Sequence, residues 1–207
     1  MTIGLRERKK QQTRQAIHVA AMRLFAERGF EATTIADIAA AADISPRTFF
    51  AYFPSKEEVV FAKFEPAFED FDRTLSERAP GTTALEALRG WIGRAAQEFS
   101  GDADAARLEA RLRRDSAAVA ACDLQHMRLF EQRLAEAVGE DLGEPADGLR
   151  PRLVAAAAVA ALQASSDKAD VILEDDRERA EAIIADPAAF IDDALRFLEA
   201  GLAALRS

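Results

Sequence analysis

The sequence predicts an all-α protein, on three observations. Alanine dominates the 207-residue chain, whereas only 10 glycines, 7 prolines and 1 tyrosine occur, a composition that favours helices over sheets. Apolar residues recur at i, i+4 and i+7 along long segments, which is the spacing of a buried helix face. Helix-start signals, an N-cap residue followed by a capping partner or a proline, precede those segments.

The N-terminal segment is divided by these signals into three helices. The first is expected over residues 5–28, and Gly29 behind it is a typical C-terminal cap. Thr34 and Asp37 form a capping box that begins the second helix. The third is expected over residues 46–53, because an N-cap serine and a proline at the first helical position precede it and another proline follows it.

The remainder of the chain is also expected to be helical. Ser55 begins a long helix that Pro66 kinks, because proline removes a backbone hydrogen bond and crowds the carbonyl group four residues before it. Thr83 and Glu86 form a second capping box, which opens a helix that runs to Phe99. Further helices are expected at 102–114, 116–138, 148–168 and from 187 onward, with 174–181 as either a solvated helical face or a charged linker.

The formal net charge of −9 is unevenly distributed. Residues 1–56 hold nine Lys or Arg against five acidic residues, whereas the rest of the chain holds 18 against 31. An acidic protein is a poor nucleic-acid binder as a whole, but the N-terminal surplus allows a local positive face. An ordinary basic N-terminus explains the surplus equally well, so charge alone leaves both interpretations open.

The segment 46–53 is a candidate recognition helix. On a helical wheel Arg47 and Thr48 share one face, whereas Phe49 and Phe53 lie on the opposite face and can anchor the helix. Two short helices joined by a tight turn describe a helix-turn-helix, whose second helix enters the major groove of DNA. An outward arginine at this place can contact guanine O6 and N7 together.

Eight residues are candidate contacts to DNA, one of them the base-reading arginine and the rest contacts to bases or phosphates. A basic arm before them is expected to follow the phosphate backbone. The candidate contacts are Thr34, Ser45, Pro46, Arg47, Thr48, Phe50, Tyr52 and Lys56, and the arm comprises Arg6, Arg8, Lys9, Lys10 and Arg14.

The stretches FAERGFEATTI, IAAAADIS and FFAYFPSKE, within residues 10–65, resemble the DNA-binding domain of the tetracycline-repressor (TetR) family of bacterial regulators. The resemblance implies DNA contacts for six of the eight candidates, all except Pro46 and Phe50. Asp43 stands where the family often has glycine, and Asp tolerates the left-handed conformation that such a turn can require. Phe50 stands where tyrosine is frequent, and the Pro46–Arg47 pair leaves the operator preference open.

The family resemblance implies a DNA-binding domain over residues 1–54 and a divergent helical domain over residues 55–207 that binds a small ligand and dimerises. The stretches EARLRR and RPRLVAAAAVAAL also resemble the mycofactocin-type regulators of this family, which would imply a long-chain acyl-CoA-like effector. From the residues alone, we expect a homodimer through the last two helices. For the alanine-rich segment 153–162, an ordinary core helix fits almost as well. The final helix carries an apolar stripe of Ile191, Leu195, Leu198, Leu202 and Leu205, with Phe190 and Phe197 beside it.

An apolar effector pocket is expected around the kinked helix. Each aromatic ring taken singly is more simply a core residue, and the arginines of 107–114 form either a solvated cluster or a grip for an anionic group. The candidate pocket residues are Phe64, Phe68, Trp91, Phe99, Arg111, Met127 and Phe130.

No catalytic residue, metal site or cofactor is predicted. His18 and His126 lack partners at a familiar metal spacing, and Cys122 is interpreted as a buried structural thiol. The longest apolar stretch, residues 153–162, is too short to span a bilayer, the N-terminal segment has no apolar signal core, and a single cysteine excludes an internal disulfide. We expect a cytoplasmic protein.

The interpretation that follows is a ligand-responsive DNA-binding transcriptional regulator, a repressor released from its operator by a small apolar or acyl-type effector. Effector binding would shift the kinked helix and change the separation of the two recognition helices of a dimer. The alternative is a helical small-molecule-binding or interaction module that does not engage DNA. Neither the operator nor the effector follows from the sequence.

Overall fold

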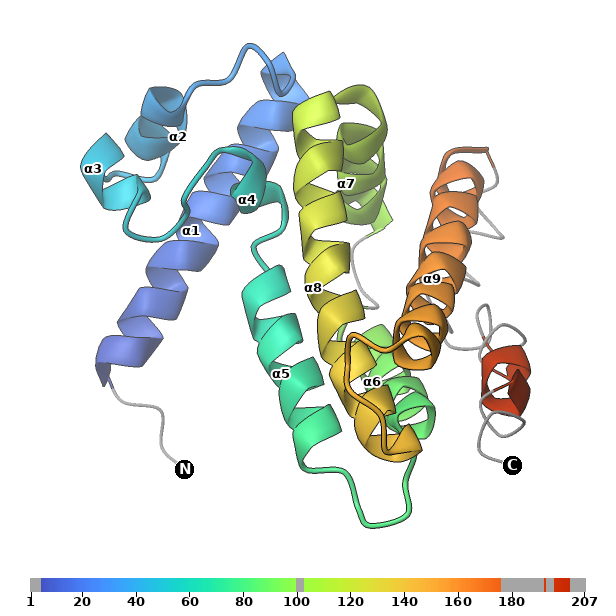
Figure 1. Cartoon of the computed structure of the whole chain (residues 1–207). Helices are drawn as coiled ribbons and strands as arrows, with labels where there is room; N and C mark the ends of the chain where they lie inside the picture. Colours follow the sequence, from blue (N-terminus) through green and yellow to red (C-terminus); the bar gives the residue numbers. More distant parts are fainter. Residues whose placement is uncertain (1–4, 100–102, 176–191, 193–195, 202–207) are drawn as a thin grey trace. The chain divides into compact units, whose positions relative to one another are not determined.

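The structure, a computed structural model, describes residues 5–99, 103–175, 192 and 196–201 (Figure 1). These residues form helices and connecting turns, without a strand in the described part, so the predicted all-α class is confirmed. The helices are α1 (Leu5–Arg28), α2 (Ile35–Ala41), α3 (Pro46–Phe49), α4 (Glu57–Val60), α5 (Phe64–Ser76), α6 (Ala84–Phe99), α7 (Ala103–Asp115), α8 (Ala117–Leu142) and α9 (Leu149–Asp175), and residues 196–201 are helical as well.

The chain forms two compact units. One comprises Met1–Phe64 and Leu108–Asp123, and the other comprises Glu65–Arg107 and Leu124–Ser207. The first unit extends past residue 54 because α4 and parts of α7 and α8 share one hydrophobic core with α1, α2 and α3. The assignment of DNA binding to residues 1–54 stays a prediction. The buried residues that join this core from outside the predicted domain are Val59, Val60, Ala62, Leu112 and Val119.

The predicted helix starts of the first unit are confirmed. Thr34 Oγ1 accepts a hydrogen bond from the Asp37 backbone N–H at 3.1 Å, and Asp37 Oδ2 accepts one from the Thr34 N–H at 2.9 Å. Ser45 caps α3 by accepting from the Thr48 N–H at 3.0 Å. Gly29 has φ +83°, which fits its predicted place as a C-terminal cap.

The predicted kink at Pro66 is wrong. The chain leaves the helical conformation at residues 61–63, between α4 and α5, and Pro66 is the third residue of the new helix. In the first turn of a helix the backbone N–H groups have no partner within the helix, so proline costs little there. The break therefore precedes the proline, and α5 itself continues to Ser76.

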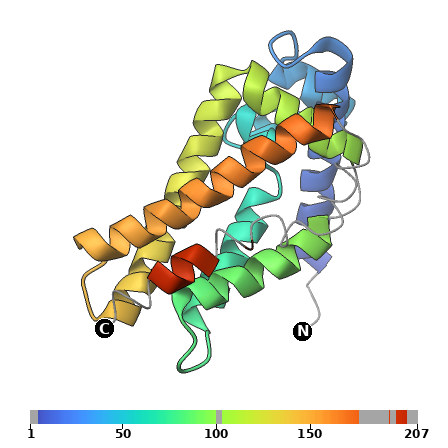
Figure 2. The ribbon, with the colours of Figure 1, turned by 90° about the vertical axis from the view of Figure 1, so that its right-hand side faces the viewer.

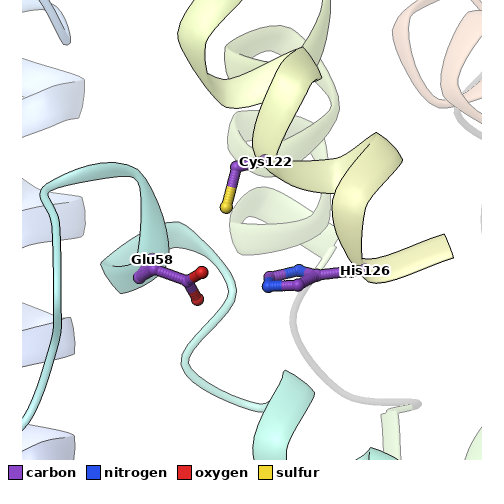
Figure 3. A group of neighbouring side chains, drawn as sticks. All are labelled: Glu58, Cys122 and His126. Carbon is purple, nitrogen blue, oxygen red and sulfur yellow. The ribbon is translucent and has the colours of Figure 1, made fainter. Parts of the chain in front are cut away.

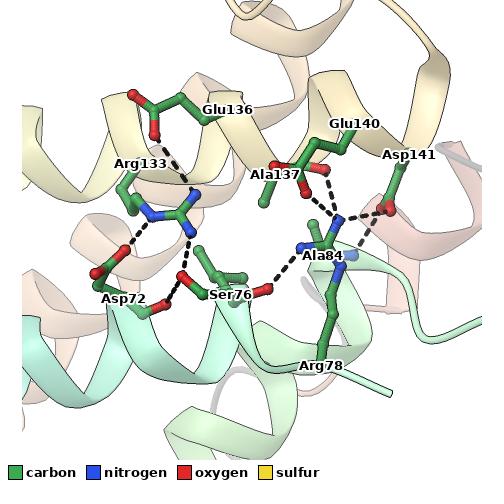
Figure 4. A network of polar contacts seen from close by, with 10 residues as sticks. Asp72, Ser76, Arg78, Ala84, Arg133, Glu136, Ala137, Glu140 and Asp141 are labelled. Carbon is green, nitrogen blue, oxygen red and sulfur yellow. Dashed lines mark hydrogen bonds and ion pairs between the residues drawn. The ribbon is translucent and has the colours of Figure 1, made fainter. Parts of the chain in front are cut away.

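Two arginines hold α5 and the loop after it against α8 in the second unit (Figure 4). Arg133 of α8 pairs with Asp72 and donates to Ser76 Oγ at 2.8 Å. Arg78 donates to the Leu75 carbonyl oxygen at 2.6 Å and pairs with Asp141, whose carboxylate also accepts from the Ala84 N–H at 2.7 Å. Asp141 thereby caps α6. This one carboxylate connects α8, α6 and the loop after α5.

The remaining described elements complete the core of the second unit. One face of α9 is buried through Val154, Ala155 and Ala158, and Leu198 joins the same core. The helical turn 196–201 lies beside α6 (Figure 2), where Arg89 pairs with Asp192 and with Glu199. The other residues of the predicted final helix, and most of 174–181, lie outside the described residues. No described helix has the length and the apolar composition that a membrane span requires.

Candidate nucleic-acid interface

Helix α3 is anchored by two phenylalanines and carries an exposed arginine. Phe49 and Phe53 are fully buried, with their ring centroids 6.0 Å apart. Arg47 is exposed to solvent, as the helical wheel predicts. Phe50 packs edge-on against Phe49 at 5.6 Å between centroids but keeps 55% of its surface exposed. The arrangement leaves one guanidinium accessible near the start of α3 and one aromatic ring accessible at its end.

The hydroxyl groups at the start of α3 bond to each other. Ser45 Oγ lies 2.8 Å from Thr48 Oγ1 and also accepts from the Thr48 N–H. Ser45 and Pro46 are exposed, and Thr48 is half-buried. Each hydroxyl oxygen has further hydrogen-bonding capacity, so a phosphate oxygen or a base edge could still bind there.

The turn between α2 and α3 brings these groups outward. Asp43 has φ +54°, the left-handed conformation that its place in the turn suggests. The Ile44 N–H bonds to the Ala39 carbonyl oxygen at 2.9 Å, which closes the end of α2. Ile38 and Ile44 pack in the core of this unit, and α1, α2 and α3 therefore form one helix-turn-helix body.

Lys56 faces the protein. Its Nζ donates to the carbonyl oxygens of Phe30 at 2.8 Å and Thr33 at 3.1 Å, and lies 4.0 Å from the centroid of the Phe30 ring. Lys56 thus binds the loop between α1 and α2, which positions the capping residue Thr34. A phosphate contact by Lys56 stays a prediction.

The basic arm contains both solvent-exposed residues and one that binds the protein itself. Arg8, Lys9 and Lys10 are exposed on the first turns of α1. Arg14 instead donates to the Tyr52 carbonyl oxygen at 2.7 Å, and its guanidinium lies 4.3 Å from the centroid of the Phe53 ring. Arg14 therefore fixes the segment after α3 against α1. Tyr52 is half-buried, and the Arg6 side chain lies outside the described part.

Three of the predicted pocket residues meet in the second unit. Phe68 of α5, Trp91 of α6 and Phe130 of α8 surround Phe71, with centroid separations of 4.9–6.4 Å from Phe71. Phe71 is fully buried, whereas its three neighbours are partly exposed. The cluster thus places three partly exposed aromatic rings at the edge of the core of this unit.

The other predicted pocket residues lie elsewhere or are not described. Arg111 is exposed on α7, in the first unit, and its Nε lies 3.9 Å from Asp115 Oδ2. Met127 of α8 and Phe64 of α5 are half-buried, and the Phe99 side chain lies outside the described part. A separate open cleft of about 370 Å³ is lined mostly by charged and hydroxyl-bearing residues. Its lining is Asp70, Arg73, Thr74, Glu77, Arg78, Thr82, Ala87, Gly90 and Arg94.

Sequence reasoning missed one cluster. Cys122 and His126 lie four residues apart on α8, a spacing that places them on one helix face, and the Glu58 carboxylate lies close to them. The four-residue spacing was visible in the sequence. The approach of Glu58, 64 residues before Cys122 in the chain, was not.

Comparison with known proteins agrees with this architecture. Residues 17–62 match the family model of bacterial regulatory proteins of the tetR family, and residues 82–203 match that of the MftR C-terminal domain. The chain belongs to the TetR family. Within this family it is similar to the HTH-type transcriptional regulator TcmR of Streptomyces glaucescens, with 41% identity over 87 residues. That match covers 42% of the present chain and 38% of TcmR.

Two solved TetR-type structures resemble the chain over most of its length. SmeT of Stenotrophomonas maltophilia, in complex with triclosan, superimposes with a TM-score of 0.62 at 22% identity, covering 89% of the present chain and 90% of SmeT. Thermus thermophilus FadR, a transcriptional repressor in complex with lauroyl-CoA, gives 0.56 at 24% identity, covering 89% and 92%. At these identities the likeness shows the fold.

Proposed function

We propose that this protein is a homodimeric, ligand-responsive repressor of transcription, which binds an operator through α3 and releases it when an apolar or acyl-type effector binds the second unit. The observation that carries the proposal is the exposed Arg47 on a helix anchored by Phe49 and Phe53. A guanidinium held outward at the start of a recognition helix can read guanine. An exposed arginine contributes nothing to the packing of the core beneath it.

The proposed DNA interface combines base reading with backbone positioning. Arg47 reads a base, whereas Ser45, Thr48 and the capping residue Thr34 contact phosphates or base edges. The exposed Arg8, Lys9 and Lys10 follow the phosphate backbone. Tyr52, Pro46, Phe50 and Lys56 complete the proposed contact set.

An apolar stripe on α9 supports the proposed dimer. Leu149 and Leu153, 82% and 59% exposed, lie one turn apart, and Ala156 and Ala160 continue the same face. Phe197, 78% exposed, adds a second apolar group on the turn 196–201. The opposite face of α9 is buried in its own core, as a helix that serves both a core and a partner requires.

The effector class is proposed from the second unit. Phe68, Trp91 and Phe130, which pack around the buried Phe71, offer partly exposed aromatic rings to an apolar chain. The match to the MftR C-terminal domain, and the likeness to a FadR that binds lauroyl-CoA, favour a long-chain acyl-CoA-like effector. Effector binding then acts on α5, whose start beside the break at 61–63 is one of the three places where the chain passes from one unit to the other. We assign no catalytic residue and place the protein in the cytoplasm.

The test begins with selection of binding sites from random duplexes, followed by fluorescence anisotropy on the selected operator. A regulator binds the selected site and loses affinity steeply as salt rises, because bound arginines and lysines displace counterions. Long-chain acyl-CoA is expected to release the operator, with free coenzyme A as control. Failure to select any sequence would favour the alternative, a helical ligand-binding module that does not engage DNA.

A further inference from the structure

Three potential metal ligands converge beside α4. Glu58 is the second residue of α4, and Cys122 and His126 are four residues apart on α8. One carboxylate oxygen, the Cys122 sulfur and one imidazole nitrogen all lie within 4.8 Å of one another. Figure 3 shows the three side chains directed toward a common space between the two helices.

The fold holds these groups with little freedom. Residues four apart on a helix lie on one face, so the uninterrupted α8 fixes His126 relative to Cys122. Glu58 belongs to the same compact unit as Cys122. Its backbone N–H bonds to Ser55 Oγ at 3.3 Å, and the neighbouring Val59 is fully buried, which fixes α4 in place. Cys122 and His126 are both buried, and Glu58 is half-buried.

The thiol is poorly suited to act as a nucleophile. Burial, and after it the charge and hydrogen bond of the Glu58 carboxylate, raise the pKa of Cys122 to about 12. At neutral pH the thiol is protonated and donates to Glu58. Thiolate reactivity requires the opposite, a lowered pKa. Redox or covalent chemistry at Cys122 is therefore not what this environment favours.

We propose that Glu58, Cys122 and His126 form a zinc site with three protein ligands and one exchangeable position. Thiolate sulfur, imidazole nitrogen and carboxylate oxygen are the donors that Zn²⁺ combines in tetrahedral sites, whereas Mg²⁺ and Ca²⁺ take oxygen donors only. On binding, the Cys122 S–H bond breaks, a sulfur–zinc bond forms and the proton passes to solvent. His126 coordinates as the neutral imidazole.

The electrostatic surroundings favour a dication. Besides Glu58, the carboxylates of Glu57 and Asp123 act on the Cys122 sulfur, and all three disfavour an additional negative charge. The same negative potential attracts Zn²⁺, whose charge offsets that of the thiolate and the carboxylate. Coordination would connect α4 to α8 directly, and a bound metal stabilises whichever conformation contains its complete site.

The probe is Co²⁺, added to the full-length protein after treatment with chelator and reductant. One Co²⁺ per chain is expected, with a sulfur-to-cobalt charge-transfer band in the near ultraviolet and strong visible bands from tetrahedral geometry. Zn²⁺ should abolish both and raise the melting temperature. Because these readouts need no DNA, their failure would leave the proposed regulator function untouched.

Three substitutions and one control test the ligands. Cys122→Ser should remove the charge-transfer band, and His126→Gln and Glu58→Gln should weaken Co²⁺ binding at least about tenfold. Glu57→Gln, which removes the adjacent carboxylate outside the cluster, should keep the band and change the affinity only slightly. Circular dichroism checks folding, and if Cys122→Ser does not fold, Glu58→Gln against Glu57→Gln decides. A folded wild type without the band, or equal losses for those two variants, would overturn the proposal.

Discussion

Lys56 donates a hydrogen bond to the Phe30 carbonyl oxygen at 2.8 Å while its ammonium lies 4.0 Å from the centroid of the ring of the same residue. Lys56 Nζ donates a second hydrogen bond to the Thr33 carbonyl oxygen, so one ammonium group binds two residues of the loop between α1 and α2. This loop leads into the capping box at Thr34. The lysine that the sequence places among the DNA contacts is thus also a structural element of the domain that bears them.

Lys56→Ala is expected to lower the free energy of unfolding by about 1–3 kcal/mol, because two carbonyl groups lose a charged donor. Urea denaturation followed by circular dichroism measures the loss, and Arg47→Ala, at an exposed position, serves as control. If Lys56 also contacts a phosphate, Lys56→Ala should make the slope of log affinity against log salt concentration less steep by about one. Unchanged stability in Lys56→Ala would contradict the structural role.

Arg47→Ala should weaken binding to the selected operator by about 1–3 kcal/mol and relax the preference at a single base pair. Arg47→Lys is expected to recover part of the affinity but little of the specificity, because an ammonium cannot form the two parallel hydrogen bonds of a guanidinium. Anisotropy titrations on the operator and its single-base variants make the comparison. An equal loss on every sequence would identify Arg47 as a phosphate contact.

Signals confined to a few residues predicted the fold well. The caps at Thr34 and Ser45 depend on bonds that span three residues, so their chemistry is complete in the local sequence. The anchoring of Phe49 and Phe53 followed from helix periodicity alone. These elements set the exposure of Arg47, and the central feature of the candidate interface could therefore be predicted.

Features that depend on distant partners were not predictable in this way. The sequence predicts a bend at Pro66, but proline is tolerated in the first turn of a helix, and the break lies earlier, between α4 and α5. Long side chains such as Lys56 can reach either solvent or a carbonyl group, and its partner at Phe30 is 26 residues away. The approach of Glu58 to Cys122 likewise depends on packing.

Asp43 offers a test of the turn that separates α2 from α3. At φ +54° a β-branched side chain is strained, so Asp43→Val should destabilise the protein by about 1–2 kcal/mol. Asp43→Gly removes the strain but makes the unfolded chain more flexible. It should leave the free energy of unfolding unchanged or raise it by at most about 1 kcal/mol. Urea unfolding of both variants provides the measurement, and equal stabilities for Val and Gly would show that the turn tolerates other conformations.

His18 should make the stability of the protein depend on pH. Its Nδ1 donates to the Val59 carbonyl oxygen at 2.8 Å, and burial lowers its pKa below the ordinary 6.5, helped by the charges of Lys63 and Arg14 and opposed by the bond to Val59. Because the unfolded chain then binds the proton more readily, stability is complete above 6.5 and is lost as pH falls from there through the folded pKa.

The corresponding measurement is urea unfolding at several pH values between about 7.5 and about 5.5, where histidine titrates. The wild type should lose stability toward the acidic end, whereas His18→Gln, which cannot take up the proton, should lose less over the same range despite a lower stability at neutral pH. Lys63→Gln removes one of the charges that lower the His18 pKa, so its acidic loss should be smaller than that of the wild type. Parallel pH profiles for the wild type and His18→Gln would mean that another group governs the acid sensitivity.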